Sequence, residues 1–203
     1  MPARDDFGRL RARVVGILTR PAAEWPEIAG ERTDPPTLMR QYAAPLAAIP
    51  AVCRWIGLTV IGAWLPIVGT FRVGMVRGLV SAVVAWLFAL GGLYVAALVV
   101  DWLAPTFKST RGIVPALKLV VYASTPVWIV GVLNLFPVFV PLTLLGALYS
   151  AYLFSVGLPP VAHTPADQVV PYMFVATLIT IVVFLVLGLA AGAIVGVGGY
   201  AGV

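Results

Sequence analysis

The sequence predicts an all-α polytopic membrane protein, a bundle of five transmembrane helices with an N-terminal amphipathic interfacial helix. Of the 203 residues, 61% are hydrophobic and 10% are charged, whereas a soluble domain carries about 25% charged residues. Five apolar stretches each approach the roughly 20 residues that a helix needs to cross a bilayer. Basic residues gather near the N-terminus, as is typical of a segment that stays in the cytoplasm.

The N-terminal residues 1–40 are expected to form a cytoplasmic amphipathic helix and a connector, and residues 41–203 the five-helix transmembrane domain. Between positions 6 and 20, helical spacing places five apolar residues on one face: Phe7, Leu10, Val14, Ile17 and Leu18. Three arginines fall mostly on the other face: Arg9, Arg13 and Arg20. This pattern predicts a helix in the membrane interface with its arginines toward anionic lipid. A cytosolic helix packed on the ends of the spans fits the pattern equally well.

Pro21 is expected to end this helix, because proline interrupts helical hydrogen bonding. The segment from there to Arg40 carries four acidic residues and several prolines, which indicates an irregular connector. Trp25 is expected to lie at headgroup depth, where tryptophan is enriched.

The five expected spans run from about Ala43 to Leu65, Leu79 to Leu103, Pro115 to Leu135, Val138 to Leu158, and from Pro171 to the C-terminus. In the third span, Pro126 removes a backbone donor and should kink the helix. Ser124 and Thr125 lie beside this break and can satisfy the carbonyls that it frees.

The distribution of Lys and Arg in the short flanks predicts the orientation. With the N-terminus inside, the inner side holds the basic residues Arg4, Arg9, Arg11, Arg13, Arg20, Arg32, Arg40, Lys108 and Arg111. The outer side then holds Arg72 and Arg77. We therefore expect a cytoplasmic N-terminus and a C-terminus on the outer side.

Arg54 is the charge that falls deepest in a predicted span. A charge near the bilayer centre costs at least about 2.5–3.5 kcal/mol, so it should find partners there. The expected partners are the break in the third span, the tyrosines Tyr149 and Tyr152, or an incoming anion. Alternatively, the first span begins near Pro50, and Arg54 reaches the cytoplasmic headgroups through its long side chain.

Few other polar groups fall inside the spans. Tyr149 and Tyr152 share a helix face, and with Ser124 and Thr125 they predict a hydrogen-bonded seam between the third and fourth spans. Asp101 and Lys118 are expected on the same side of the membrane, as an ion pair that joins two helices or as part of a proton relay.

The fifth span carries glycines at four-residue steps: Gly188, Gly192 and Gly196. These allow another helix to approach closely, either within the chain or in a dimer.

No catalytic or metal-binding pattern stands out. The chain has one cysteine and one histidine, too few for a structural zinc site. It contains no H-E-x-x-H and no glycine-rich phosphate loop, and Leu153 stands where a nucleophile elbow before Ser155 would need glycine. No basic face of a folded module indicates nucleic-acid binding. We therefore expect no cofactor, no metal and no enzymatic activity.

Several stretches resemble the bacterial branch of the Ypt/Rab-interacting protein (YIP) family. They are ILTRPAAEWPEI at Ile17–Ile28, DWLAPTF at Asp101–Phe107, ALKLVVYASTPVWIVGVL at Ala116–Leu133 and GALYSAYLFSVGLPPVAHTP at Gly146–Pro165. The resemblance implies five membrane helices, a cytosolic N-terminus and, in eukaryotic members, roles in vesicle traffic and contacts with prenylated Rab GTPases. The Asp-Leu-Tyr-Gly-Pro motif of the eukaryotic cytosolic region is not in this sequence.

Two functions are consistent with these features. The first is a non-enzymatic component of the bacterial inner membrane that organises the membrane or binds protein, with anionic lipid, a second copy or another membrane protein as partner. The alternative is a transporter or channel for a small ion or solute, with Arg54 and the kink of the third span along its path.

Overall fold

The computed structural model describes residues 2–65 and 69–199, and the surroundings of side chains over residues 7–62, 72–136 and 138–186. Within these residues, five helical stretches are long and apolar enough to cross a membrane: Pro35–Ile61, Met75–Phe107, Ile113–Leu135, Val138–Ala162 and Val169–Val186. The five predicted spans are therefore confirmed, and the first begins earlier than expected.

Most spans are built from more than one helical segment. The first comprises α3 (Pro35–Leu38), η1 (Met39–Ala43), α4 (Ala44–Ile56) and η2 (Gly57–Ile61), and the second α5 (Met75–Leu103) and η3 (Ala104–Phe107). The third comprises α6 (Ile113–Ala123), α7 (Thr125–Val130) and η4 (Gly131–Leu135), the fourth η5 (Pro137–Leu142) and α8 (Thr143–Ala162), and the fifth α9 (Val169–Gly199). A short antiparallel pair, β1 (Ala63–Leu65) and β2 (Gly69–Phe71), lies between the first two spans with Ala63 opposite Phe71.

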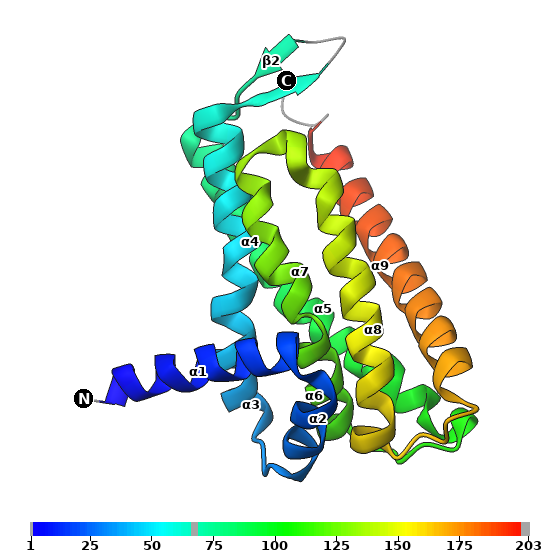
Figure 1. Cartoon of the computed structure of the whole chain (residues 1–203). Helices are drawn as coiled ribbons and strands as arrows, with labels where there is room; N and C mark the ends of the chain where they lie inside the picture. The colour runs from blue at the N-terminus through cyan, green and yellow to red at the C-terminus, as the bar shows by residue number, and fades with distance from the viewer. Residues whose placement is uncertain (1, 66–68, 200–203) are drawn as a thin grey trace.

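The third span is the centre of the bundle. About two thirds of its most apolar window is buried, at 67%, against 11–22% for the other four spans. Its helix α6 packs between α5 and α8, and α7 packs between α4 and α8 (Figure 1). The other spans therefore present most of their surface to the bilayer, which accounts for the many exposed apolar side chains on α5, α8 and α9.

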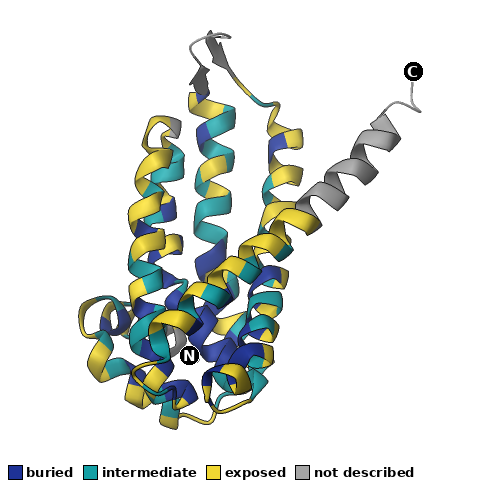
Figure 2. Cartoon of the chain, turned by 90° about the vertical axis from the view of Figure 1, so that its right-hand side faces the viewer, coloured by how far each residue is buried: buried dark blue, intermediate teal, exposed yellow. Residues whose placement is uncertain are grey.

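Two further helices cover one end of the bundle, which we call the α1 end. Helix α1 (Pro2–Thr19) runs across the direction of the spans, and α2 (Pro21–Gly30) lies below it in Figure 1. Buried residues gather at this end of the molecule (Figure 2). Most of the apolar face predicted for α1 packs on protein: Ile17 is fully buried, and Leu10, Val14 and Leu18 pack against the core. Phe7, near the start of the helix, is 68% exposed.

The prediction of an irregular connector directly after Pro21 is wrong, because a helix begins there. Pro21 is the first residue of α2, where its missing N–H costs nothing and its fixed φ suits a helix. Trp25 is fully buried, so its side chain contacts protein, and its place at headgroup depth stays a prediction. A Cβ added to Gly157 would lie 2.6 Å from both the Trp25 ring and Leu119 Cδ1, so this glycine lets the indole seat against α8 and α6.

The predicted break of the third span at Pro126 is confirmed. Helix α6 ends at Ala123, and α7 begins at Thr125. Proline lacks the N–H that would bond the carbonyl of Tyr122 four residues earlier. Thr125 Oγ1 donates to that carbonyl instead, at 2.8 Å, and Ser124 Oγ donates to Val120 O at 2.7 Å.

Candidate functional site

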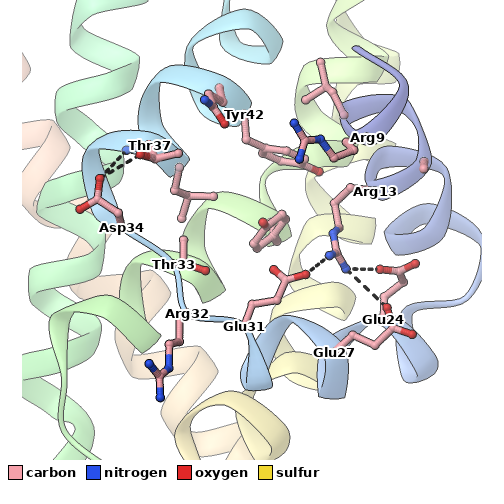
Figure 3. Close-up of a pocket in the computed structure, with 15 residues that line it drawn as sticks. Arg9, Arg13, Glu24, Glu27, Glu31, Arg32, Thr33, Asp34, Thr37 and Tyr42 are labelled. Carbon is pink, nitrogen blue, oxygen red and sulfur yellow. Dashed lines mark hydrogen bonds and ion pairs between the residues drawn. The ribbon is translucent and has the colours of Figure 1, made fainter. Parts of the chain in front are cut away.

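A cluster of charged side chains lies between α1 and α2. Glu24, Glu27 and Glu31 are spaced three and four residues apart along and just beyond α2, so they project toward one side. Arg13 of α1 reaches this side. Its Nη1 lies 2.6 Å from Glu24 Oε2 and 3.8 Å from Glu27 Oε2, and its Nη2 pairs with Glu31 Oε1 (Figure 3).

A pocket of about 580 Å³ opens beside this cluster. Further polar side chains line it from α1 and from the chain between α2 and α4, namely Arg9, Arg32, Thr33, Asp34, Thr37 and Gln41. Tyr42 and Tyr122 also line it, and their rings contact each other at a centroid distance of 4.6 Å. The pocket therefore lies where the N-terminal helices meet the first and third spans.

The charges of this pocket, which we call the Arg13 pocket, are unevenly exposed. The Arg13 and Glu24 side chains are 20% and 18% exposed, whereas Glu27 is 70% exposed. Burial lowers the pKa of the Arg13 guanidinium, but Glu31 and Glu24 outweigh it, and the pKa lies above its usual value. Arg13 therefore stays charged and fixes Glu24, while Glu27 remains accessible to a partner.

The three arginines predicted to face lipid have different surroundings. Arg20 is exposed, Arg9 lines the Arg13 pocket, and Arg13 is turned inward to the carboxylates. The prediction is thus wrong for Arg13. An irregular segment over residues 21–40 does not predict these acidic partners, although the spacing of its glutamates is that of one helix face.

Lys118 holds the N-terminal helices on the spans. Its Nζ is buried and donates to Ile28 O at 2.7 Å and to Glu31 O at 2.5 Å. These carbonyls belong to the last turn of α2 and its cap, where an ammonium group is favourable. Lys118 therefore ties the third span to the end of α2.

The predicted ion pair between Asp101 and Lys118 is not formed. Asp101 Oδ1 instead accepts a hydrogen bond from Gly112 N at 2.6 Å, and its Oδ2 lies 3.7 Å from Arg111 Nε. Gly112 directly precedes α6, so the carboxylate satisfies a free donor at the start of that helix.

The seam predicted between the third and fourth spans is also wrong, since its hydroxyls bond elsewhere. Thr125 Oγ1 shares a hydrogen bond of 2.9 Å with Tyr42 OH in the first span. Tyr149 OH donates to Leu18 O at the end of α1, at 2.7 Å, and Tyr152 stacks on Tyr149 with 49% of its surface exposed. These groups therefore join the third and fourth spans to the N-terminal part of the chain.

Thr125→Val is expected to lower the free energy of unfolding in detergent by about 2 kcal/mol. It removes the hydrogen bond to Tyr42 and the one to Tyr122 O, and each such bond contributes roughly 0.5–1.5 kcal/mol. The matched control is Thr180→Val, because Thr180 Oγ1 donates to Ala176 O of its own helix. An equal decrease in the free energy of unfolding in the two variants would contradict a stabilising hydrogen bond between Thr125 and Tyr42.

Ser150→Ala is expected to raise the free energy of unfolding in detergent by up to about 1 kcal/mol, because a buried hydroxyl without a partner destabilises the folded state. Ser150 Oγ is such an atom, in the middle of α8. The same measurement applied to Ser155→Ala serves as control, since Ser155 Oγ donates to Tyr152 O. A loss of stability on Ser150→Ala would mean that this hydroxyl has a partner.

Arg54 lies toward the end of the first span that is remote from the α1 end. It follows Tyr42 by twelve positions, which is about 18 Å along a helix. The next residue, Trp55, donates from Nε1 to Met75 O at the start of α5. Arg54 is exposed and forms no hydrogen bond or ion pair within the described part of the chain. The structure thus places it neither at the middle nor at the start of the span, and away from Ser124 and Thr125.

The glycine stripe Gly188, Gly192 and Gly196 falls in α9, but its surroundings lie outside the residues whose side-chain environment is described.

The five spans and the polar cap at the α1 end define an integral membrane protein, as the composition predicts. The chain belongs to the Yip1 domain family, because the Yip1 domain model matches residues 15–197. This confirms the resemblance stated from the sequence. The chain is similar to the inner membrane protein YohC of Escherichia coli K12, with 28% identity over 152 residues, which cover 73% of this chain and 77% of that protein. The YohC protein of the E. coli O6:H1 strain matches to the same extent. No solved structure matches the chain significantly.

Proposed function

We propose that the protein is a non-enzymatic component of the bacterial cytoplasmic membrane that binds a protein partner at the α1 end. The observation that carries this proposal is the Arg13 pocket. It lies outside the bulk of the spans, it is large enough to accept side chains of another protein, and its base is fixed by Arg13 and Glu24. A pre-organised polar surface loses little entropy when a partner binds.

The partner is proposed to present basic groups to the rim of the pocket. The pocket is lined by four carboxylates and three guanidiniums, which leaves one negative charge in excess: Glu24, Glu27, Glu31 and Asp34 against Arg9, Arg13 and Arg32. Glu27 is the most exposed of the three glutamates. Arg11 and Arg20 of the same unit are also exposed, and we propose that they contact anionic lipid beside the docked partner.

We further propose that the α1 end faces the cytoplasm. The Lys and Arg distribution supports this, since Lys108 and Arg111 lie in the loop that joins the second and third spans at this same end. That loop is fixed to the end of α8 by a hydrogen bond from Thr110 N to Ala162 O at 2.7 Å. It is fixed to the loop between the fourth and fifth spans by a hydrogen bond of 2.9 Å between the Ser109 and Thr164 hydroxyls. The similar E. coli protein is named for the inner membrane.

The transport alternative draws less support from the geometry. Its proposed elements, Arg54 and the hydroxyls at the third-span break, are separated along the bundle by about 18 Å. The break hydroxyls of Ser124 and Thr125 donate to backbone carbonyls. Anion flux through vesicles that contain the protein, compared with Arg54→Ala, tests this alternative, and a flux that depends on Arg54 would restore it.

Site-specific photocrosslinking of the full-length protein in native membranes tests partner docking. A benzophenone amino acid at Arg32, on the pocket rim, is expected to give a discrete protein adduct, while one at exposed Met75, at the far end, is not. Glu27→Lys should abolish the Arg32 adduct through repulsion of a basic partner, and the exposure of Glu27 makes it a mild change for folding. Identical adducts at both positions, or an Arg32 adduct that persists in Glu27→Lys, would overturn the proposal.

A further inference from the structure

A second cavity lies inside the membrane domain, between α5, the third span, α8 and α9. Its volume is about 260 Å³. Each of the four surrounding elements contributes a small side chain to its wall: Ala96, Ala123, Ala151 and Ala176. Because these positions carry methyl groups rather than larger side chains, the packed helices leave space between them.

The cavity opens sideways toward the bilayer. Its mouth is formed by exposed residues of α8 and α9, namely Ala147, Thr177 and Ile181. Its back wall is formed by Val120 and Ala123 of the third span, which are 8% and 4% exposed. All of these residues lie within the candidate membrane spans, so the medium at the mouth is hydrocarbon.

The lining favours hydrocarbon over water. Ten of the fourteen lining residues are apolar, and the hydroxyls of Ser124 and Thr180 already donate to backbone carbonyls four residues earlier. Ser150 also lines the cavity, and its buried Oγ has no partner. An apolar space left empty forfeits the dispersion contacts of its walls, and a flexible chain from the adjacent bilayer can restore them.

We propose that this cavity, here called the α8–α9 cavity, binds one hydrocarbon chain of a membrane lipid, inserted between α8 and α9 until it contacts the third span. This lipid hydrocarbon chain would fill the space that the small side chains leave at the centre of the bundle. This site is separate from the Arg13 pocket, and the inference does not depend on partner docking there.

The test uses the full-length protein in lipid nanodiscs that contain a phospholipid with a diazirine in one acyl chain. After illumination, mass spectrometry is expected to find adducts on the peptide around Val120 and Ala123, which general lipid around the protein cannot reach because these residues are buried. Ala151→Leu fills the cavity, and Ala147→Leu blocks its mouth. Each variant should lower the yield of lipid adducts on the third span at least about fivefold. The control Ala89→Leu, on the exposed face of α5, should leave this yield unchanged.

Two results would overturn the proposal. One is labelling of the exposed faces of α5 and α9 with no adduct on the third span, as expected if water or a second copy of the chain fills or covers the cavity. The other is third-span labelling that persists in both Ala151→Leu and Ala147→Leu. Hydrogen exchange of α2 in each variant verifies that the fold is retained, and the mouth variant Ala147→Leu decides the question if Ala151→Leu does not fold.

Discussion

Trp25→Ala is expected to release α2 from the spans and to lower the free energy of opening of this helix by about 3–5 kcal/mol, the usual range for removing a buried aromatic side chain. Trp25 is fully buried between Gly157 and Leu119, and its ring meets Tyr122 edge-on at 6.4 Å. Hydrogen exchange of the α2 amides, measured on the full-length protein in micelles, reports this opening free energy.

The matched control is Trp102→Ala, which removes the same side chain from a position on α5 that is 65% exposed. It should leave exchange in α2 unchanged, because bilayer or detergent covers the vacated surface. Similar exchange in the wild-type and Trp25→Ala proteins would show that the indole does not fix α2.

Lys118→Met is expected to lower the opening free energy of α2 by about 2–3 kcal/mol. Methionine keeps the length of the side chain but removes the ammonium group that binds Ile28 O and Glu31 O. Hydrogen bonds from a charged donor contribute roughly 1.5–3 kcal/mol each, and relief of the cost of burying the charge offsets part of the loss. Exchange should rise most at the C-terminal turn of α2, whereas Trp25→Ala should affect the whole helix.

The chain's other lysine provides the control for this experiment. Lys108 is exposed in the loop between the second and third spans, so Lys108→Met should not change exchange in α2. An equal increase in the exchange rates of the α2 amides in both variants would indicate a general effect of the lost positive charge. Slower exchange in Lys118→Met would show that the buried ammonium destabilises the docked state.

Much of the fold could be predicted from the sequence, because the membrane imposes strict rules on composition and length. The five spans follow from apolar stretches of sufficient length, and the break at Pro126 follows from the chemistry of proline. The role of Thr125 at the freed Tyr122 carbonyl was also within reach, since the two residues are close in sequence.

The candidate site was less predictable, because it depends on contacts between distant segments. The prolines of the α2 segment predict an interrupted helix, although Pro21 is well suited to the first turn of a helix. Once α2 is recognised as helical, its glutamates and Arg13 can be expected to meet. The partner of Lys118 could not be derived in this way, since backbone carbonyls carry no signature in a sequence.

The docking of Trp25 against Gly157 has a consequence for biogenesis. Helix α2 leaves the ribosome before any of the spans, yet its binding surface is complete only once α8 has been made. At about 5–20 residues per second, this leaves a delay on the order of ten seconds. During that interval the Trp25 indole lacks its contact with Gly157. Docking of α2 is therefore a late step of assembly, completed only after the fourth span has been made.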